Sequence, residues 1–195
     1  MQFLDDSVYI ENVMNGDTAS FAGLVDKHRD MVYTIALRIV RNHHDAEEIA
    51  QDAFLKVYRS LDSFKQQSKF TTWLYRIVYN TAISKVRKKK YETTAIDEAM
   101  IENYSVDEVH SQVQGLDEEE QKMLIDATLD KLPEEESTLI SLYYLSECSV
   151  DEISQITGLT LSNVKVKLHR TRKKMYTLMQ QMLTYNMDIP PQAAG

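Results

Sequence analysis

Two stretches of the sequence carry basic side chains and no acidic ones. From Ser63 to Lys90 there are eight Lys or Arg residues and no Asp or Glu, and residues 159–187 hold six basic residues and again no acid. Closely spaced cations neutralise nucleic-acid phosphates, and aromatic rings among them can stack on unpaired bases. The first stretch also contains Phe64, Phe70 and Trp73. The chemistry indicated is nucleic-acid binding, with exposed basic helix ends as the alternative.

The overall charge conceals this pattern. The 195 residues include 22 Lys and Arg against 30 Asp and Glu, and the resulting net charge of −8 by itself argues against a nucleic-acid-binding protein. Residues 91–158, however, hold 18 of the acids and only two of the bases, so the rest of the chain is net positive. An acidic segment can compete with DNA for basic ones. We therefore expect residues 91–120 to weaken DNA binding by the free protein.

The composition indicates a soluble, cytoplasmic and mostly helical protein. Five Gly and three Pro leave few residues that interrupt helices, and apolar residues recur at helical spacing. The single Cys148 allows no internal disulfide, no long apolar run indicates a membrane span, and the acidic N-terminus lacks the layout of a signal peptide. No cofactor or metal is predicted, because His43 and His44 lack further ligands at a useful spacing. A redox role for Cys148 is not favoured, since no basic cluster surrounds it in the sequence.

Three amphipathic helices are predicted within residues 1–90, which we interpret as one domain. They cover residues 17–40, 45–58 and 72–90, and each carries an apolar stripe at helical spacing. Asp45 is expected to cap the second helix. His28 falls on the apolar stripe of the first, so we expect it to be a packed side chain.

A second domain is predicted at residues 118–180. Residues 91–117 show no sustained periodicity and many acids, which is typical of a flexible linker, and residues 181–195 are expected to form a disordered tail. The predicted fold class is therefore all-α, with two small helical domains joined by an acidic flexible linker.

The second domain contains a predicted helix-turn-helix. Ser149 and Glu152 form an S-x-x-E capping box for a short helix, which Gly158 can end in a left-handed conformation. Thr160 can cap the next helix, which is basic and free of acids. Ordinary helical hairpins share this layout, but the acid-free charge favours DNA. The outward positions of the second helix are Ser162, Asn163, Lys165, Val166, Lys167, His169 and Arg170.

Four segments in a fixed order carry a family resemblance. They are FAGLVDKHRDMVYTIALRIV, DAEEIAQDAFLKVYRSLDSF, KFTTWLYRIVYNTAISKVRK and LPEEESTLISLYYLSECSVDEISQITGLTLSNVKVKLHRTRKKM. Together they resemble the extracytoplasmic-function group of bacterial RNA polymerase sigma factors. The combination is more specific than either half, because helix-turn-helix domains are common by themselves.

The resemblance implies a non-catalytic subunit rather than an enzyme. Such a protein binds core RNA polymerase and promoter DNA, uses no small-molecule substrate, does not insert into membranes, and is held inactive in many relatives by an anti-sigma factor. By the same resemblance, residues 1–90 would read and help to melt the −10 element, and residues 118–180 would read the −35 element. The family's polymerase contact falls on Asp45, Glu48, Gln51, Asp52 and Leu55.

The family's −10 segment falls on residues 64–90, where the residue chemistry agrees. Rings can stack on unpaired bases, amides can bind a flipped base, and cations can follow the backbone. Trp73 is equally interpretable as a core residue. The −10 candidates are Phe64, Phe70, Trp73, Arg76, Asn80, Lys85, Arg87 and Lys88, and the −35 candidates are Thr160, Ser162, Asn163, Lys165, Lys167 and Arg170.

The sequence departs from the family pattern at two places. Residues 164–168 read VKVKL where the family commonly has V-K-S-R-L, and lysine cannot present the planar fork of arginine to guanine, although Val166 can touch a thymine methyl. Cys148 stands where the family often has glycine, so we expect a strained or different turn there.

Two other classes of function are compatible with parts of the sequence. A stand-alone helix-turn-helix regulator would use residues 1–90 for sensing or dimerisation, but the basic block at 63–90 and its aromatic residues count against it. The second alternative is an all-helical enzyme. The sequence does not support it, because no serine or cysteine nucleophile lies beside a credible base.

Overall fold

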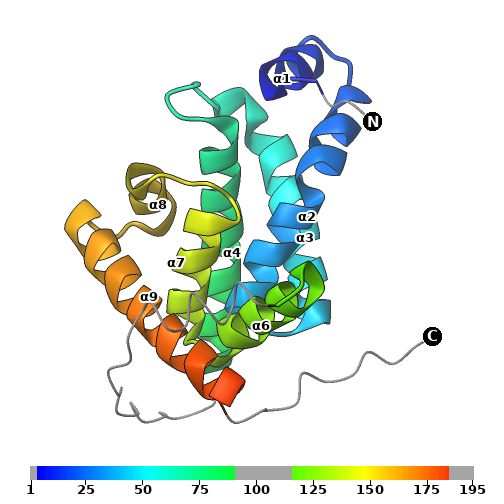
Figure 1. Ribbon diagram of the computed structural model, residues 1–195. Coiled ribbons are helices and arrows are strands. Elements are labelled where there is room, and N and C mark those ends of the chain that lie inside the picture. The colour runs from blue at the N-terminus through cyan, green and yellow to red at the C-terminus, as the bar shows by residue number, and fades with distance from the viewer. Residues whose placement is uncertain (1–3, 91–115, 185–195) are drawn as a thin grey trace.

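The computed structural model describes residues 4–90 and 116–184, and every regular element within these ranges is helical. The predicted all-α class is confirmed. Residues 91–115 of the predicted linker, with most of its acids, and residues 185–195 of the predicted tail lie outside the described ranges, as do the side chains of residues 88–90. The helices are α1 (Asp6–Met14), α2 (Ser20–Val40), α3 (His43–Ser60), α4 (Phe70–Lys90), α6 (Glu118–Lys131), α7 (Glu134–Tyr144), α8 (Val150–Thr157) and α9 (Leu161–Thr184), with a 3₁₀ turn at Leu61–Ser63 (Figure 1).

In the first domain, α2, α3 and α4 pack around a shared core. The apolar stripe of α2 supplies Leu24, Val32 and Ile35, none of which is exposed to solvent. Burying such side chains is the main favourable term in folding, at roughly 2 kcal/mol each. The fully buried residues of the other two helices are Ala46, Ala53, Val57, Leu74, Val78 and Ala82.

The helices of this domain start at residues that differ from the predicted ones. α2 begins at Ser20, because the Asp17 carboxylate accepts a hydrogen bond from the Ser20 hydroxyl (2.6 Å) in the preceding turn. α3 begins at His43, because its N-cap is Asn42 and not Asp45; the Asn42 side chain accepts a hydrogen bond from the Asp45 amide at 2.9 Å. α4 begins at residue 70, two residues before the predicted start.

An additional helix, α1, precedes the predicted ones. Asp5 caps it by accepting a hydrogen bond from the Ser7 amide at 2.9 Å. Asp6 Oδ1 lies 2.7 Å from Lys27 Nζ and 2.9 Å from His28 Nε2, which fixes α1 to α2. His28 is buried, so its prediction as a packed side chain is confirmed.

In the second domain, α8 and α9 form the predicted helix-turn-helix. Both halves of the capping box are present: the Glu152 amide donates to Ser149 Oγ (3.2 Å), and the Ser149 amide donates to Glu152 Oε2 (2.8 Å). Gly158 ends α8 with a left-handed φ of +76°, as predicted. Thr160 Oγ1 accepts a hydrogen bond from the Asn163 amide (3.3 Å), and α9 then continues four residues beyond residue 180, where the domain was predicted to end.

In the turn before α8, the residue with a strained left-handed backbone lies one position earlier than predicted. Glu147, an exposed residue, takes the left-handed φ of +51°, whereas Cys148 is buried and its amide donates to the Leu142 carbonyl at 2.9 Å. Burial, assisted by the nearby Glu152 carboxylate, raises the pKa of the Cys148 thiol to about 11. The thiol is therefore protonated at neutral pH, which makes it a poor nucleophile.

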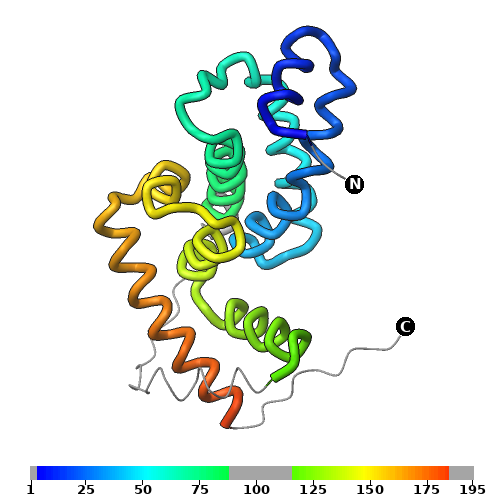
Figure 2. Tube along the Cα trace, turned by 45° about the horizontal axis from the view of Figure 1, so that its top comes forward, coloured from blue at the N-terminus to red at the C-terminus, as the bar shows by residue number. Residues whose placement is uncertain are grey.

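The two domains pack against each other. α7 lies on α2, and α8 lies on α4, as Figures 1 and 2 show. Leu132 and Leu139 of the second domain belong to the same buried cluster as the core of the first. Across the boundary, the Arg38 guanidinium of α2 contacts Asp126 (2.5 Å) and Asp130 (2.8 Å) of α6. The contact between domains thus combines an apolar core with a two-carboxylate ion pair.

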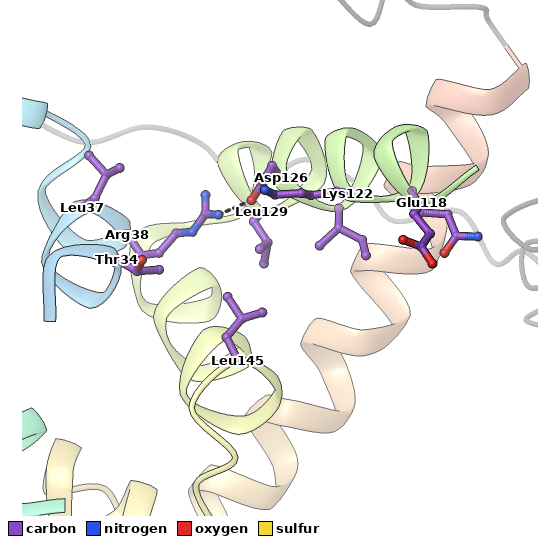
Figure 3. A pocket seen from close by; sticks show the side chains of 10 residues that line it. Thr34, Leu37, Arg38, Glu118, Lys122, Asp126, Leu129 and Leu145 are labelled. Atoms are coloured by element: carbon purple, nitrogen blue, oxygen red, sulfur yellow. Dashed lines mark hydrogen bonds and ion pairs between the residues drawn. The ribbon is translucent and has the colours of Figure 1, made fainter. Parts of the chain in front are cut away.

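A cleft of about 600 Å³ borders this contact, between α2, α6 and the end of α7 (Figure 3). Ile125, Leu129 and Leu145 provide its apolar lining, and the Arg38–Asp126 pair lies at its α2 side. The domains therefore pack tightly along α7 and α8 and leave a groove beside α6.

Glu152 links α8 to α4 and supports the start of α8 at the same time. Its Oε1 accepts from Lys69 Nζ (2.9 Å) and from the Thr72 hydroxyl (3.3 Å). Partial burial works to raise the pKa of this carboxyl, but the hydrogen bonds from Ser149 and the Lys69 ammonium outweigh it and lower the pKa from 4.5 to about 2. A carboxylate whose pKa is lowered in the folded state stabilises the fold above the unfolded pKa, and this contribution disappears as the pH falls from about 4.5 towards 2.

We expect Glu152→Gln to lower the free energy of unfolding at pH 7 by about 2 kcal/mol, because a cap and a charge-assisted contact are weakened. The variant should also lose less stability than the wild type between pH 5 and pH 3, since it has no carboxylate to protonate there. Urea unfolding followed by circular dichroism measures both. The matched control is Asp151→Asn, which removes an exposed neighbouring carboxylate outside the contact with α4. Equal loss of stability on acidification in the wild type and Glu152→Gln would contradict this assignment.

Candidate nucleic-acid interface

One face of α9 is basic and exposed along the N-terminal half of the helix. Val164, Leu168 and Thr171 are buried on the opposite side. Residues three and four positions apart share a face of a helix, so the exposed residues at this spacing form a continuous outward surface, which we call the α9 stripe. The α9 stripe consists of Ser162, Lys165, Val166, His169, Arg170 and Lys173.

The structure divides the six −35 candidates into three groups. Ser162, Lys165 and Arg170 lie on the stripe, while Thr160 and Asn163 are exposed at the start of the helix. Lys167 lies beside the stripe, with its Nζ 2.9 Å from a Glu135 carboxylate oxygen of α7. His169 and Lys173 belong to the stripe but were not among the candidates, although the helical spacing from Ser162 identifies both.

Other basic residues of α9 hold the helix against α7. Arg172 Nε donates to the Tyr144 hydroxyl at 2.8 Å, and the guanidinium lies 5.0 Å from the ring centre of Tyr143. Lys174 Nζ lies 3.2 Å from Glu136. Half of the six cations in the second basic stretch, including Lys167, therefore have partners on α7.

A second exposed face runs along α4. Arg76, Asn80 and Arg87 are exposed at helical spacing, and Trp73 is half-buried at the start of the same face. These four −10 candidates are thus brought together on one side of α4. Lys88 lies among the side chains that the structure does not describe.

Three aromatic rings form a cluster beside the first turn of α4. The ring centres of Phe64 and Trp73 lie 5.1 Å apart, and that of Phe70 lies 5.8 Å from the first and 6.0 Å from the second. Phe64 and Trp73 are half-buried, but Phe70 is 5% exposed and also packs on His28. The structure therefore keeps Phe70 out of reach of a base, because α2 covers its ring.

Lys85 lies away from the α4 face and contacts α3. Its Nζ is 2.6 Å from Glu48 Oε2 and 2.9 Å from Asp45 Oδ1, and these two carboxylates raise the pKa of Lys85. A −10 candidate thus contacts two of the polymerase candidates.

The polymerase candidates share one face of α3. Glu48, Gln51 and Asp52 are exposed, Asp45 is half-buried at the start of the helix, and Leu55 is 52% exposed in the middle of its outer side. An acidic surface with an exposed leucine fits a basic partner surface that contains an apolar pocket. Tyr58, 44% exposed one turn further on, extends this face and was not among the candidates.

The side chains of His44, Asp45 and Glu48 are the one group in the described ranges that could supply three metal ligands, with ligand atoms within 4.8 Å of one another. The Lys85 ammonium already contacts both carboxylates and offsets one of their two negative charges. This charge arrangement does not favour a divalent cation, and we assign no metal to it.

A capped helix-turn-helix with a basic outer face is typical of DNA-binding proteins, and here it forms part of a chain with two helical domains. Comparison with known protein families identifies the group of DNA-binding proteins to which the chain belongs. The family described as Sigma-70 region 2 matches residues 24–91, and Sigma-70, region 4 matches residues 122–175. The chain belongs to the extracytoplasmic-function (ECF) RNA polymerase sigma factors. Such a protein binds core RNA polymerase and promoter DNA and directs promoter-specific transcription initiation.

Relatives match nearly the whole chain. The chain is 36% identical to the ECF RNA polymerase sigma factor SigW of Bacillus subtilis over 184 residues, covering 85% of this chain and 92% of the relative. It is 30% identical to the ECF RNA polymerase sigma-E factor of Escherichia coli K12, covering 92% and 97%. The solved sigma factor RpoE of Bartonella quintana, in complex with the anti-sigma factor NepR, has the same fold, with a TM-score of 0.63 at 21% identity over 82% of this chain and 96% of that one.

The family assignment decides between the functions that the sequence left open. A match to region 2 over residues 24–91 is not expected for a stand-alone helix-turn-helix regulator. Between residues 4 and 90, and between 116 and 184, no helix combines the length and apolar character needed to cross a bilayer.

Proposed function

We propose that the two domains divide promoter recognition between them: residues 1–90 bind core polymerase and read the −10 element, and residues 118–180 read the −35 element. The observation that carries this proposal is the α9 stripe, a basic surface on the second helix of a helix-turn-helix that the packing of the two domains leaves exposed. In such motifs the second helix enters the major groove.

The α4 face is the proposed −10 reader. Half-buried Phe64 and Trp73 can stack on unpaired bases, and buried Phe70 supports both rings from below. The exposed Asn80 amide can hydrogen-bond a flipped base, while Arg76 contacts the backbone phosphates. Lys85, Arg87 and Lys88 complete the cationic path in this proposal, once Lys85 leaves its carboxylate partners.

The exposed face of α3 is the proposed contact with core polymerase. It presents Asp45, Glu48, Gln51, Asp52 and Leu55, that is, carboxylates and an amide around an apolar centre. The carboxylates of this face favour a partner surface with basic side chains, because opposite charges attract across an interface. The leucine side chain adds apolar contact area.

We further propose that the chain has no catalytic activity of its own and acts in the cytoplasm, where the transcription machinery is. An anti-sigma factor is a further proposed partner, supported by the complex in which the Bartonella quintana relative was solved.

The decisive experiment reconstitutes transcription from purified parts. The protein is mixed with core polymerase and a promoter pool, the complex is isolated by gel filtration, and transcript starts are sequenced. We expect a stoichiometric complex and starts at a defined set of promoters. Failure to bind core polymerase, or starts no different from those of core polymerase alone, would contradict the proposal.

Within the α9 stripe, Arg170→Ala should weaken promoter binding by the complex with core polymerase about tenfold, because the exposed guanidinium is lost from the DNA-facing surface. Lys167→Ala should have a smaller effect, since Lys167 must first leave Glu135. Filter binding at several salt concentrations measures both, and core binding should stay at the wild-type level. Unchanged promoter affinity in Arg170→Ala would remove α9 from the −35 contact.

A further inference from the structure

The α9 stripe has a single apolar member. Val166 is 46% exposed and is flanked on the stripe by Lys165, His169 and Arg170, all exposed polar or charged residues. An isolated exposed apolar side chain is common on protein surfaces and by itself indicates nothing. The position is informative here, because Val166 occupies the middle of the stripe that we propose faces DNA.

The chemistry of valine restricts what it can read. Its side chain has no hydrogen-bond donor or acceptor, so it cannot bind the polar major-groove atoms of any base, including O4 of thymine. Thymine alone presents a methyl group there. Because β-branching holds Val166 in one dominant rotamer within a helix, little side-chain entropy is lost when its methyl groups meet a partner.

We propose that Val166 is a specificity-determining residue that selects one thymine of the −35 element through contact with the C5 methyl group. This inference rests on the proposed role of α9 and adds the chemistry of one base position to it. The surrounding stripe residues then have separate roles: Lys165 and Lys173 follow phosphates, and Arg170 is the only stripe residue whose fork can bind guanine with two hydrogen bonds.

The test removes only the methyl group from the DNA. The complete complex of this chain with core polymerase binds promoter duplexes in which each thymine of the −35 element is replaced, one at a time, by deoxyuridine. At one position we expect the wild-type affinity to fall about fourfold, the effect of removing one buried methyl-sized group. Val166→Ala should weaken binding to the unmodified promoter by a similar factor and should show no further loss on the deoxyuridine duplex.

Leu161→Ala is the matched control. Leu161 is also 46% exposed but lies five positions from Val166, about 140° around the helix, at the edge of the stripe beside Lys165. This variant should keep the full deoxyuridine effect. The inference is overturned if no deoxyuridine position weakens wild-type binding, or if Val166→Ala retains the whole effect. Absence of promoter binding by the wild-type complex would instead contradict the proposed function.

Discussion

Reversing two charges on α3, in the variant Glu48→Lys with Asp52→Lys, should weaken binding to core polymerase at least about a hundredfold. Each reversal places a cation where the proposed basic partner surface expects a carboxylate, and like charges brought together across an interface cost several kcal/mol, of which about 1.4 kcal/mol corresponds to each factor of ten. The two residues are one turn apart and both exposed, so they meet the same part of the partner.

The two positions differ in their contacts within the chain, which makes the single variants informative. Glu48 pairs with Lys85, so its reversal also creates repulsion inside the first domain. Among the described residues Asp52 has no ion-pair partner, and Asp52→Lys changes only the outer surface. Loss of core binding in Asp52→Lys is therefore a docking effect rather than a folding effect.

The matched control reverses Asp26 and Asp30 on α2. These residues are also four positions apart, and their side chains are 60% and 98% exposed, so the control makes the same change of net charge on another face. Affinities for core polymerase are measured by fluorescence anisotropy of labelled protein. Wild-type affinity in the α3 variant, or an equal loss in the α2 control, would contradict docking through α3.

Local signals predicted the helix-turn-helix well. The capping box of Ser149 and Glu152, the left-handed Gly158 and the cap at Thr160 depend on residues a few positions apart, and all are present in the structure. The start of α3 was wrong because two capping residues compete there, and Asn42 rather than Asp45 occupies the N-cap. α1 was missed, because its nine residues are held in place by Asp6 contacts with α2 that lie more than twenty residues away.

The candidate sites were harder to predict from the sequence than the helix-turn-helix. Counting charges does not show which Lys or Arg side chains already form ion pairs with carboxylates elsewhere in the chain. Lys85 and Lys167 each sit in a basic stretch, yet their carboxylate partners are 37 and 32 residues away in the sequence. Aromatic residues pose the same problem. Phe70 and Trp73 are three positions apart on α4, and the contact with His28 of α2 helps to bury Phe70. This contact comes from a residue 42 positions away in the sequence.

If the two domains divide the promoter as proposed, their packed arrangement is too compact to reach both elements at once. Promoter elements centred near −35 and −10 are 25 base pairs apart, which is about 85 Å along B-form DNA. A helical domain of this size has a radius of gyration of only about 13 Å, so two domains in contact do not span that distance. The 27 residues between α4 and α6 span at most about 95 Å when fully extended, so the chain length permits separation. Separation requires that Arg38 leave Asp126 and Asp130 and that Glu152 leave Lys69.

Holding the domains together should therefore abolish promoter-specific transcription. We would introduce Arg38→Cys and Asp130→Cys into a Cys148→Ala background and join the two thiols with a short reducible cross-linker. Both positions line one cleft at the domain boundary, where the reagent replaces an existing ion pair. Transcription from a promoter with both elements should fall at least about a hundredfold and return after reduction, because the cross-link rather than the substitutions prevents separation.

A duplex that carries only the −35 element separates this effect from a loss of folding. The α9 stripe is exposed while the domains are packed, so the cross-linked chain should bind that duplex with unchanged affinity. Each single cysteine variant, treated with the same reagent, should transcribe normally. Normal initiation by the cross-linked chain would show that the packed arrangement reads both elements and would overturn the division of roles. Loss of binding to the −35 duplex as well would show that the packed arrangement hides α9, contrary to its exposure in the structure.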